Sequence, residues 1–178
     1  MLLSAFLLQL VATTPNAVPS TTVANVPPSS ARVPRVAERA PTFGPSRVET
    51  APEIDGRDDD ASWKTVAAIT SFRQFEPTED GEPTLRTEAR IAYDAHNLYI
   101  VVRSFDPKPD SILSVLQRRD AQLLSDDIVV GIDSYNDKRT GYMFRLTAAG
   151  AMADGYVFND GEEDWGWNAV WQGAARVD

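Results

Sequence analysis

Short apolar runs that alternate with polar residues constrain the fold of this chain more than any other sequence feature. In residues 87–93 the odd positions are apolar or small, whereas the intervening Glu88 and Arg90 can face water. This period of two is typical of a half-buried strand. Turn-forming residues at 94–97 then precede an unbroken apolar run at 98–102, which indicates a strand covered on both faces. Together the two segments predict a β-hairpin.

The same pattern recurs along the rest of the chain. Further strands are predicted at residues 128–132, 142–146, 156–158 and 169–176. Residues 111–120 fit neither the helical nor the strand period, so a helix and a strand both stay open there. No long helical stripe appears elsewhere. This density of strands predicts an all-β fold, a jelly-roll β-sandwich of antiparallel strands.

The N-terminal region has a different composition from the strand-rich part. Residues 1–20 begin with a short, uncharged apolar run that predicts a signal peptide, with a buried N-terminal helix as the alternative. Residues 21–48 are rich in proline and predict a flexible linker. The sandwich is expected at residues 49–178, and its last predicted strand has no partner, so we expect the domain to be incomplete at its C-terminus. The exported protein would act in the periplasm, in the outer membrane or outside the cell.

Charge and side-chain chemistry exclude several classes of function. The 178 residues include 17 Lys and Arg against 26 Asp and Glu, and the net charge of −9 repels a nucleic-acid backbone. No cysteine is present, which excludes disulfides, thiolate nucleophiles and cysteine zinc sites. The single histidine, His96, lies in the predicted hairpin turn and cannot form a multi-histidine metal site. The sequence motifs of serine hydrolases, phosphate-binding loops and zinc proteases are also absent.

One pair of neighbouring carboxylates leaves hydrolysis as a weak hypothesis. Two carboxyl groups can hydrolyse a glycosidic bond when they flank it at a suitable separation. Asp126 and Asp127 are adjacent in sequence, however, and adjacent residues on a strand point to opposite faces. A glycosidase would therefore need a further acidic residue.

Three acidic loops, at residues 55–60, 133–137 and 159–164, are rich in the hard oxygen donors that Ca²⁺ prefers. We expect a structural calcium ion, because such an ion could stabilise an exported sandwich that has no disulfides. Solvated loops that only add solubility are the alternative. The candidate ligands are Asp55, Asp59, Asp133 and Asp160.

A cluster of tryptophans near the C-terminus is the second chemical signal. Trp165, Trp167 and Trp171 have odd spacings that would place them on one face of a regular strand. Flat indole rings suit the apolar faces of sugar rings, and the neighbouring Asn168 could bind sugar hydroxyls. We expect Trp63 and Trp171 in the core, whereas core and platform roles both stay open for Trp165 and Trp167.

Several segments, in this order, carry a family resemblance. They are Ile54-Asp55-Gly56 with Asp59 and Trp63, residues 87–99, Asp106-Pro107, and residues 125–133. The first resembles the I-D-G-x-x-D-x-x-x-W opening of family 9 carbohydrate-binding modules, and the resemblance covers about residues 48–178. It implies a jelly-roll sandwich that binds sugars, holds structural calcium ions and is attached to secreted polysaccharide-degrading enzymes.

Two further segments refine this resemblance. Arg118-Arg119-Asp120 and the 167–171 ending are similar to modules at the front of large bacterial envelope proteins, some of which continue into a membrane β-barrel. In the sugar-binding members, one indole of an aromatic clamp stands just before the acidic strand. This chain has Leu123-Leu124-Ser125 there instead, so the resemblance transfers no clamp residue.

Three functions follow as hypotheses. The first is a non-catalytic module that binds a poly- or oligosaccharide through Trp165, Trp167 and Asn168, in an exported protein linked to polysaccharide breakdown. The second is a structural or interaction domain at the front of an outer-membrane β-barrel protein. The third is a glycoside hydrolase.

Overall fold

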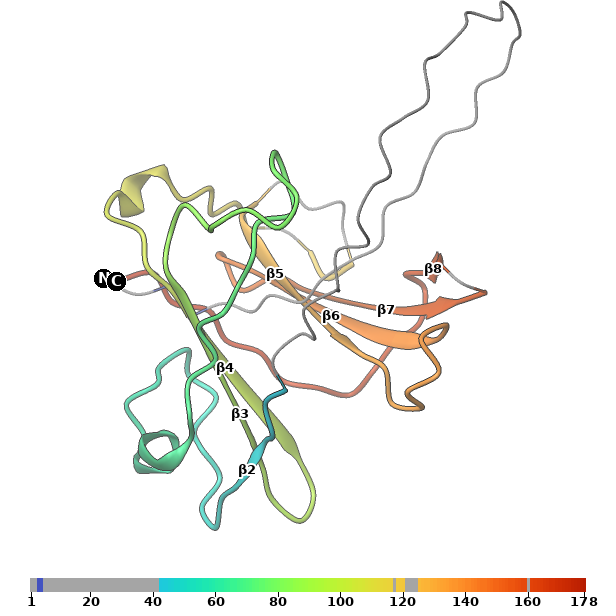
Figure 1. Cartoon of the computed structure of the whole chain (residues 1–178), viewed down its shortest axis with the longest axis horizontal. Coiled ribbons are helices and arrows are strands. Elements are labelled where there is room, and N and C mark those ends of the chain that lie inside the picture. Colours follow the sequence, from blue (N-terminus) through green and yellow to red (C-terminus); the bar gives the residue numbers. More distant parts are fainter. Residues whose placement is uncertain (1–2, 5–41, 117, 121–124, 160) are drawn as a thin grey trace, which may run out of the picture.

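Two four-stranded sheets form the layers of a β-sandwich (Figure 1). The computed structural model describes residues 3–4, 42–116, 118–120, 125–159 and 161–178. The first sheet has the order β1-β4-β3-β2, and the second has the order β5-β6-β7-β8. The strands are β1 (Leu3–Ser4), β2 (Ser46–Arg47), β3 (Thr87–Tyr93), β4 (Leu98–Ser104), β5 (Asp127–Ile132), β6 (Gly141–Thr147), β7 (Met152–Phe158) and β8 (Glu162–Asp164).

Helices are confined to two short 3₁₀ turns within the described residues. These are η1 (Ala61–Thr65) and η2 (Pro109–Ser111). None of the helices in the described ranges has the length and apolar character needed to cross a membrane. The segment 111–120, left open between helix and strand, is largely irregular after η2, and residue 117 lies outside the described residues. The all-β class predicted from the alternating pattern is confirmed.

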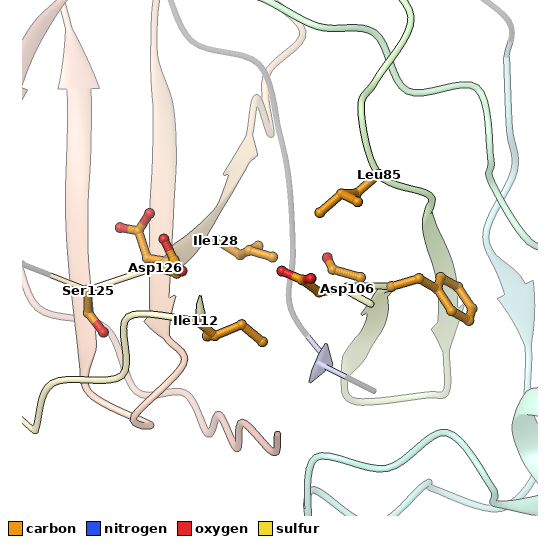
Figure 2. Close-up of a pocket in the computed structure, with 9 residues that line it drawn as sticks. Leu85, Asp106, Ile112, Ser125, Asp126 and Ile128 are labelled. Carbon is orange, nitrogen blue, oxygen red and sulfur yellow. The ribbon is translucent and has the colours of Figure 1, made fainter. Parts of the chain in front are cut away.

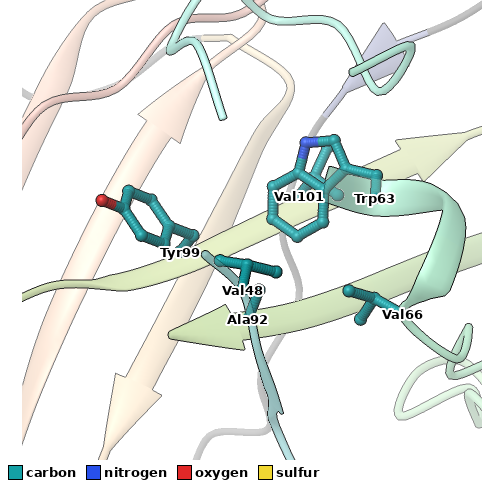
Figure 3. Packing of buried hydrophobic residues seen from close by; sticks show 6 residues of the cluster. All are labelled: Val48, Trp63, Val66, Ala92, Tyr99 and Val101. Carbon is teal, nitrogen blue, oxygen red and sulfur yellow. The ribbon is translucent and has the colours of Figure 1, made fainter. Parts of the chain in front are cut away.

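The predicted hairpin is the centre of the first sheet. β3 and β4 pair antiparallel, with Ala92 opposite Tyr99, and β2 adds a short parallel partner to β3. Residues that follow β2 and those around η1 pack on one face of this hairpin, as Figure 3 shows. The buried cluster consists of Val48, Trp63, Val66, Ala92, Tyr99 and Val101. Trp63 is therefore a core residue, as predicted.

The same face of the hairpin carries Glu88 and Arg90. The alternating pattern predicted that both face water, and this prediction is wrong. Glu88 is only 9% exposed. Arg90 lies 3.4 Å from the Asp58 carboxylate, and Arg103 on β4 lies 3.2 Å from it. Because the chain around Asp58 covers this face and supplies a negative partner, charged side chains can stay there out of water.

The second sheet is a meander in which each strand pairs with the next along the chain. β5, β6 and β7 confirm three predicted strands, and β7 begins earlier than expected, at Met152. The predicted strand at 169–176 is wrong, because that segment has no ladder partner and crosses over the sheet instead. β8, at 162–164, was not predicted.

The predicted signal peptide and linker fall mainly on residues outside the described ranges. Of residues 1–20, the structure describes only Leu3–Ser4, which pair with β4. Of residues 21–48, it describes 42–48. Both assignments stay predictions.

Candidate functional site

A row of six aromatic rings crosses one face of the second sheet. Strand pairing puts Tyr142 opposite Tyr156, and Phe144 two residues further along β6 points to the same face. Trp167 packs 4.9 Å from Tyr142, measured between ring centroids, and Trp171 packs edge-on to Phe144 at 5.4 Å. The aromatic row, as we call this set, comprises Tyr142, Phe144, Tyr156, Phe158, Trp167 and Trp171.

Trp165 lies on the opposite face of the sheet from Trp167, so the prediction of a single tryptophan face is wrong. Its ring packs against Gly155, where an added Cβ would come within 3.0 Å of the indole. The guanidinium of Arg145 lies 4.8 Å from the ring centroid, and Arg145 alternates with Phe144 on β6. The chain turns after β8, at the edge of the sheet, where the Gly166 N–H donates to the Asp164 carboxylate at 2.8 Å. Of the three C-terminal tryptophans, only Trp167 and Trp171, which follow this turn, belong to the aromatic row.

The C-terminal segment also carries a polar side chain directly after Trp167. Asn168 is exposed next to Trp167, and its side-chain amide donates to the Gly166 carbonyl at 3.0 Å. The carbonyl oxygen of this amide group can accept a further hydrogen bond. Of the predicted binding residues, Trp167 and Asn168 therefore come together, and Trp165 does not join them.

A cavity of about 740 Å³ opens beside the aromatic row, between the two sheets. Ile100 and Val102 line it from β4, and Val130 and Ile132 line it from β5. Trp171 belongs to both the aromatic row and this cavity. Its size and mostly apolar walls are typical of a small-molecule site. Sequence alternation predicts that these strand residues are buried, but it does not reveal that a space remains between the layers.

Asp154 lies opposite Phe144, on the face of the sheet that carries the aromatic row, and it is fully buried. It accepts hydrogen bonds from the Arg119 guanidinium, from the Ala169 N–H and from the Trp171 indole N–H. Sequence reasoning missed this residue, since Asp154 carries no motif and its neighbours come from distant segments. Trp171, predicted to be a core residue, is half-buried and donates its indole N–H to the buried Asp154.

The predicted calcium ligands are not gathered into one set in the described residues. Asp55 accepts from the Arg57 N–H at 2.9 Å and pairs with its guanidinium, and Asp59 lies 4.0 Å from the same guanidinium. Asp133 accepts from the N–H groups of its own loop. Among the described residues, no three His, Asp or Glu side chains are placed to hold a metal ion together, and Asp160 lies outside them. Calcium binding stays a prediction.

A second cavity, of about 400 Å³, lies between the end of β4 and the start of β5 (Figure 2). Three carboxylates line it, and each has a protein partner. Asp126 accepts from the Leu113 N–H at 2.9 Å, and Asp106 accepts from the Lys108 N–H at 2.6 Å. Asp127 lies 3.0 Å from Arg145, and burial raises its pKa although that guanidinium opposes the shift. The carboxylates are thus engaged in holding local structure.

The position expected for the family's clamp is only partly described. Residues 123 and 124 lie outside the described residues, and Ser125 donates to the Leu113 carbonyl at 2.7 Å. Ser125 therefore fixes the chain before β5, where the sugar-binding members have an indole nearby.

Comparison with known proteins yields one match. Residues 54–152 match the family described as carbohydrate family 9 binding domain-like, which is more than half of the chain. No curated protein and no solved structure matches. The matched range covers the cavity-lining strands β4, β5 and β6 but ends before Asp154 and the C-terminal tryptophans. The two-sheet sandwich and the order of the sequence motifs along the chain agree with this match. The chain belongs to the carbohydrate family 9 binding domain-like family.

Proposed function

We propose that this domain binds a glycan without catalysis, on the aromatic row of its second sheet. Membership of the family supports carbohydrate binding in general. The observation that carries the location is the position of Trp167, a half-buried indole packed on Tyr142 and followed by the exposed Asn168. Aromatic faces offer the apolar contact that sugar rings need, and an adjacent amide can bind their hydroxyls.

The glycan would extend from the aromatic row into the neighbouring cavity. Trp171 and Phe144 continue the row into the space between the sheets, whose rim carries the polar residues Asn97 and Gln172. Binding sites combine apolar walls with a few polar groups in this way. The glycan is a poly- or oligosaccharide, and the exported setting and the link to polysaccharide breakdown are part of the same proposal.

Calorimetric titration of the domain with a panel of oligosaccharides tests this proposal. We expect Trp167→Ala to weaken binding by about tenfold or more, equivalent to about 1.4 kcal/mol. Trp165→Ala is the matched control, because it removes the same side chain from the opposite face and should leave affinity within about twofold. Absence of binding to the wild-type protein at millimolar sugar would overturn the proposal. Equal losses in the two variants would overturn the location.

A structural or interaction domain is the second candidate, and one observation favours it. Two of the C-terminal tryptophans donate their indole N–H groups to carboxylates of the protein, Trp165 to the exposed Glu163 at 2.8 Å and Trp171 to the buried Asp154 at 3.3 Å. These rings stabilise the sandwich whether or not a sugar is bound. Under this alternative the domain would position a downstream membrane β-barrel or enzyme, and the Trp167→Ala variant would keep every function of the full-length protein.

A further inference from the structure

Asp154 occupies an unusual position for a charged residue. It lies on β7 directly opposite Phe144 on β6, so its side chain points to the face that carries the aromatic row. None of its surface is exposed. A carboxylate in such a place is tolerated only when hydrogen bonds and an opposite charge compensate for lost water.

Three donors from two other segments provide this compensation. One carboxylate oxygen accepts from Arg119 and from the Trp171 indole N–H, and the other accepts from the Ala169 N–H. Arg119 also donates to the Ala169 carbonyl at 3.4 Å. The Arg119–Asp154 pair therefore binds both polar groups of one peptide residue in a segment that has no strand partner.

Ala169 lies midway between Trp167 and Trp171. Fastening Ala169 at its N–H and its carbonyl fixes the chain on both sides, and the two indoles then pack on Tyr142 and Phe144. A segment that crosses a sheet face has no ladder of hydrogen bonds to set its register, so these few bonds decide where its side chains lie.

We propose that Arg119 and Asp154 are positioning residues that hold Trp167 in place for the glycan. This inference rests on the proposed function and deepens it. It also joins two sequence segments that have no other explained role, Arg118-Arg119-Asp120 and residues 167–171. The arginine acts through the tryptophan and does not touch the sugar itself.

The test compares Arg119→Met with Arg118→Met. Both variants remove one guanidinium, and the exposed Arg118 is the sequence neighbour that makes no bond to Asp154. Near-ultraviolet circular dichroism reports the surroundings of the tryptophans, and calorimetry reports sugar affinity. We expect Arg119→Met to change the tryptophan spectrum and to weaken binding by about tenfold, whereas Arg118→Met leaves both unchanged.

A purely structural role gives a different result. It would lower the melting temperature of Arg119→Met, yet the folded protein at low temperature would keep the wild-type spectrum and affinity, and that outcome overturns the inference. Arg119→Lys retains the charge without the forked geometry and should recover part of both signals, which covers the case in which Arg119→Met fails to fold. If Arg119→Met does not fold, a folded Arg119→Lys that keeps the full wild-type spectrum and affinity would also overturn it.

Failure of the proposed function remains distinguishable. If the wild-type protein binds no sugar, the glycan proposal fails, while the tryptophan spectra of the Arg119 and Arg118 variants still decide whether the pair positions the indoles. A changed spectrum in Arg119→Met alone supports the positioning role, and matching spectra in the two variants refute it.

Discussion

At the scale of single residues, the four tryptophans of this chain show how neighbours decide a side chain's role. Trp63 is almost completely buried in the cluster on the first sheet. Trp165 rests on Gly155 beneath Arg145, and Trp171 is tied to a buried carboxylate. Trp167 packs on the rings of Tyr142 and Phe144, and no side chain in the described part of the chain accepts a hydrogen bond from its indole N–H. An indole without an internal polar partner is the one most suited to a ligand.

We expect Asp94 to make the hairpin turn sensitive to acid. Its carboxylate accepts from the Tyr99 hydroxyl at 2.6 Å and from the N–H groups of His96 and Asn97, and these bonds lower its pKa from 3.8 to about 2. A lowered folded-state pKa stabilises the fold above the ordinary value, and this contribution disappears as the pH falls from about 4 to about 2.

Asp94→Asn should therefore lower the melting temperature at pH 6 and have a smaller effect near pH 2. Tyr99→Phe removes the largest cause of the pKa shift and should show the same convergence with the wild-type protein at acid pH. Thermal unfolding followed by circular dichroism at several pH values measures both. A deficit in melting temperature that is equal at pH 6 and pH 2 would contradict this assignment.

At the scale of elements, the chain around residues 55–60 is attached to the first sheet by charge as well as by packing. Asp58 bridges Arg90 and Arg103 on neighbouring strands. Gly56 adopts a positive φ of 82° and approaches the backbone at 175–176, where a Cβ would come within 3.2 Å. The glycine in the Ile54-Asp55-Gly56 segment thus serves both a turn and a close contact.

Asp58→Asn should destabilise the domain by about 1–3 kcal/mol, because it removes the carboxylate that two partly buried arginines share. Among the described residues, Arg90 then keeps only Glu88, at 3.5 Å. Asp80→Asn is the control, since Asp80 pairs with the exposed Arg73 at 3.3 Å and such surface pairs contribute less than about 1 kcal/mol. Urea denaturation of the two variants measures the difference. Equal free energies of unfolding for both variants would show that the bridge contributes nothing.

The prediction of strands succeeded where a local pattern of apolar residues marks the buried face. It failed where the structure of a segment depends on residues distant in sequence. The segment that became β3 alternates in sequence, and the segment that became β4 is an unbroken apolar run. Both patterns are local signatures of a strand that packs on one face or on both. Residues 169–176 contain apolar side chains at suitable spacing, yet the Ala169 backbone bonds to the side chains of Asp154 and Arg119. None of the described strands forms a ladder with this segment. Local pattern does not encode such bonds.

At the scale of the whole molecule, a calcium ion that stabilises the fold is a prediction still to be tested. The acidic loops at 55–60 and 133–137 are predicted to bind the ion, although their described carboxylates already have protein donors. If calcium binds, a chelator should lower the melting temperature of the wild-type domain, and Asp133→Ala should remove that effect. An unchanged melting temperature after chelation would exclude a stabilising ion.

The sequence by itself determined the all-β class, the hairpin at β3 and β4, the family and the exclusion of cysteine and multi-histidine chemistry. These properties depend on residue types and on periods of two, which are local. Only the tertiary structure decided that Trp165 and Trp167 lie on opposite faces, that Glu88 is buried and that Asp154 joins three segments. Those properties depend on how the chain turns at a sheet edge and on which distant groups meet there, and no short-range pattern specifies either.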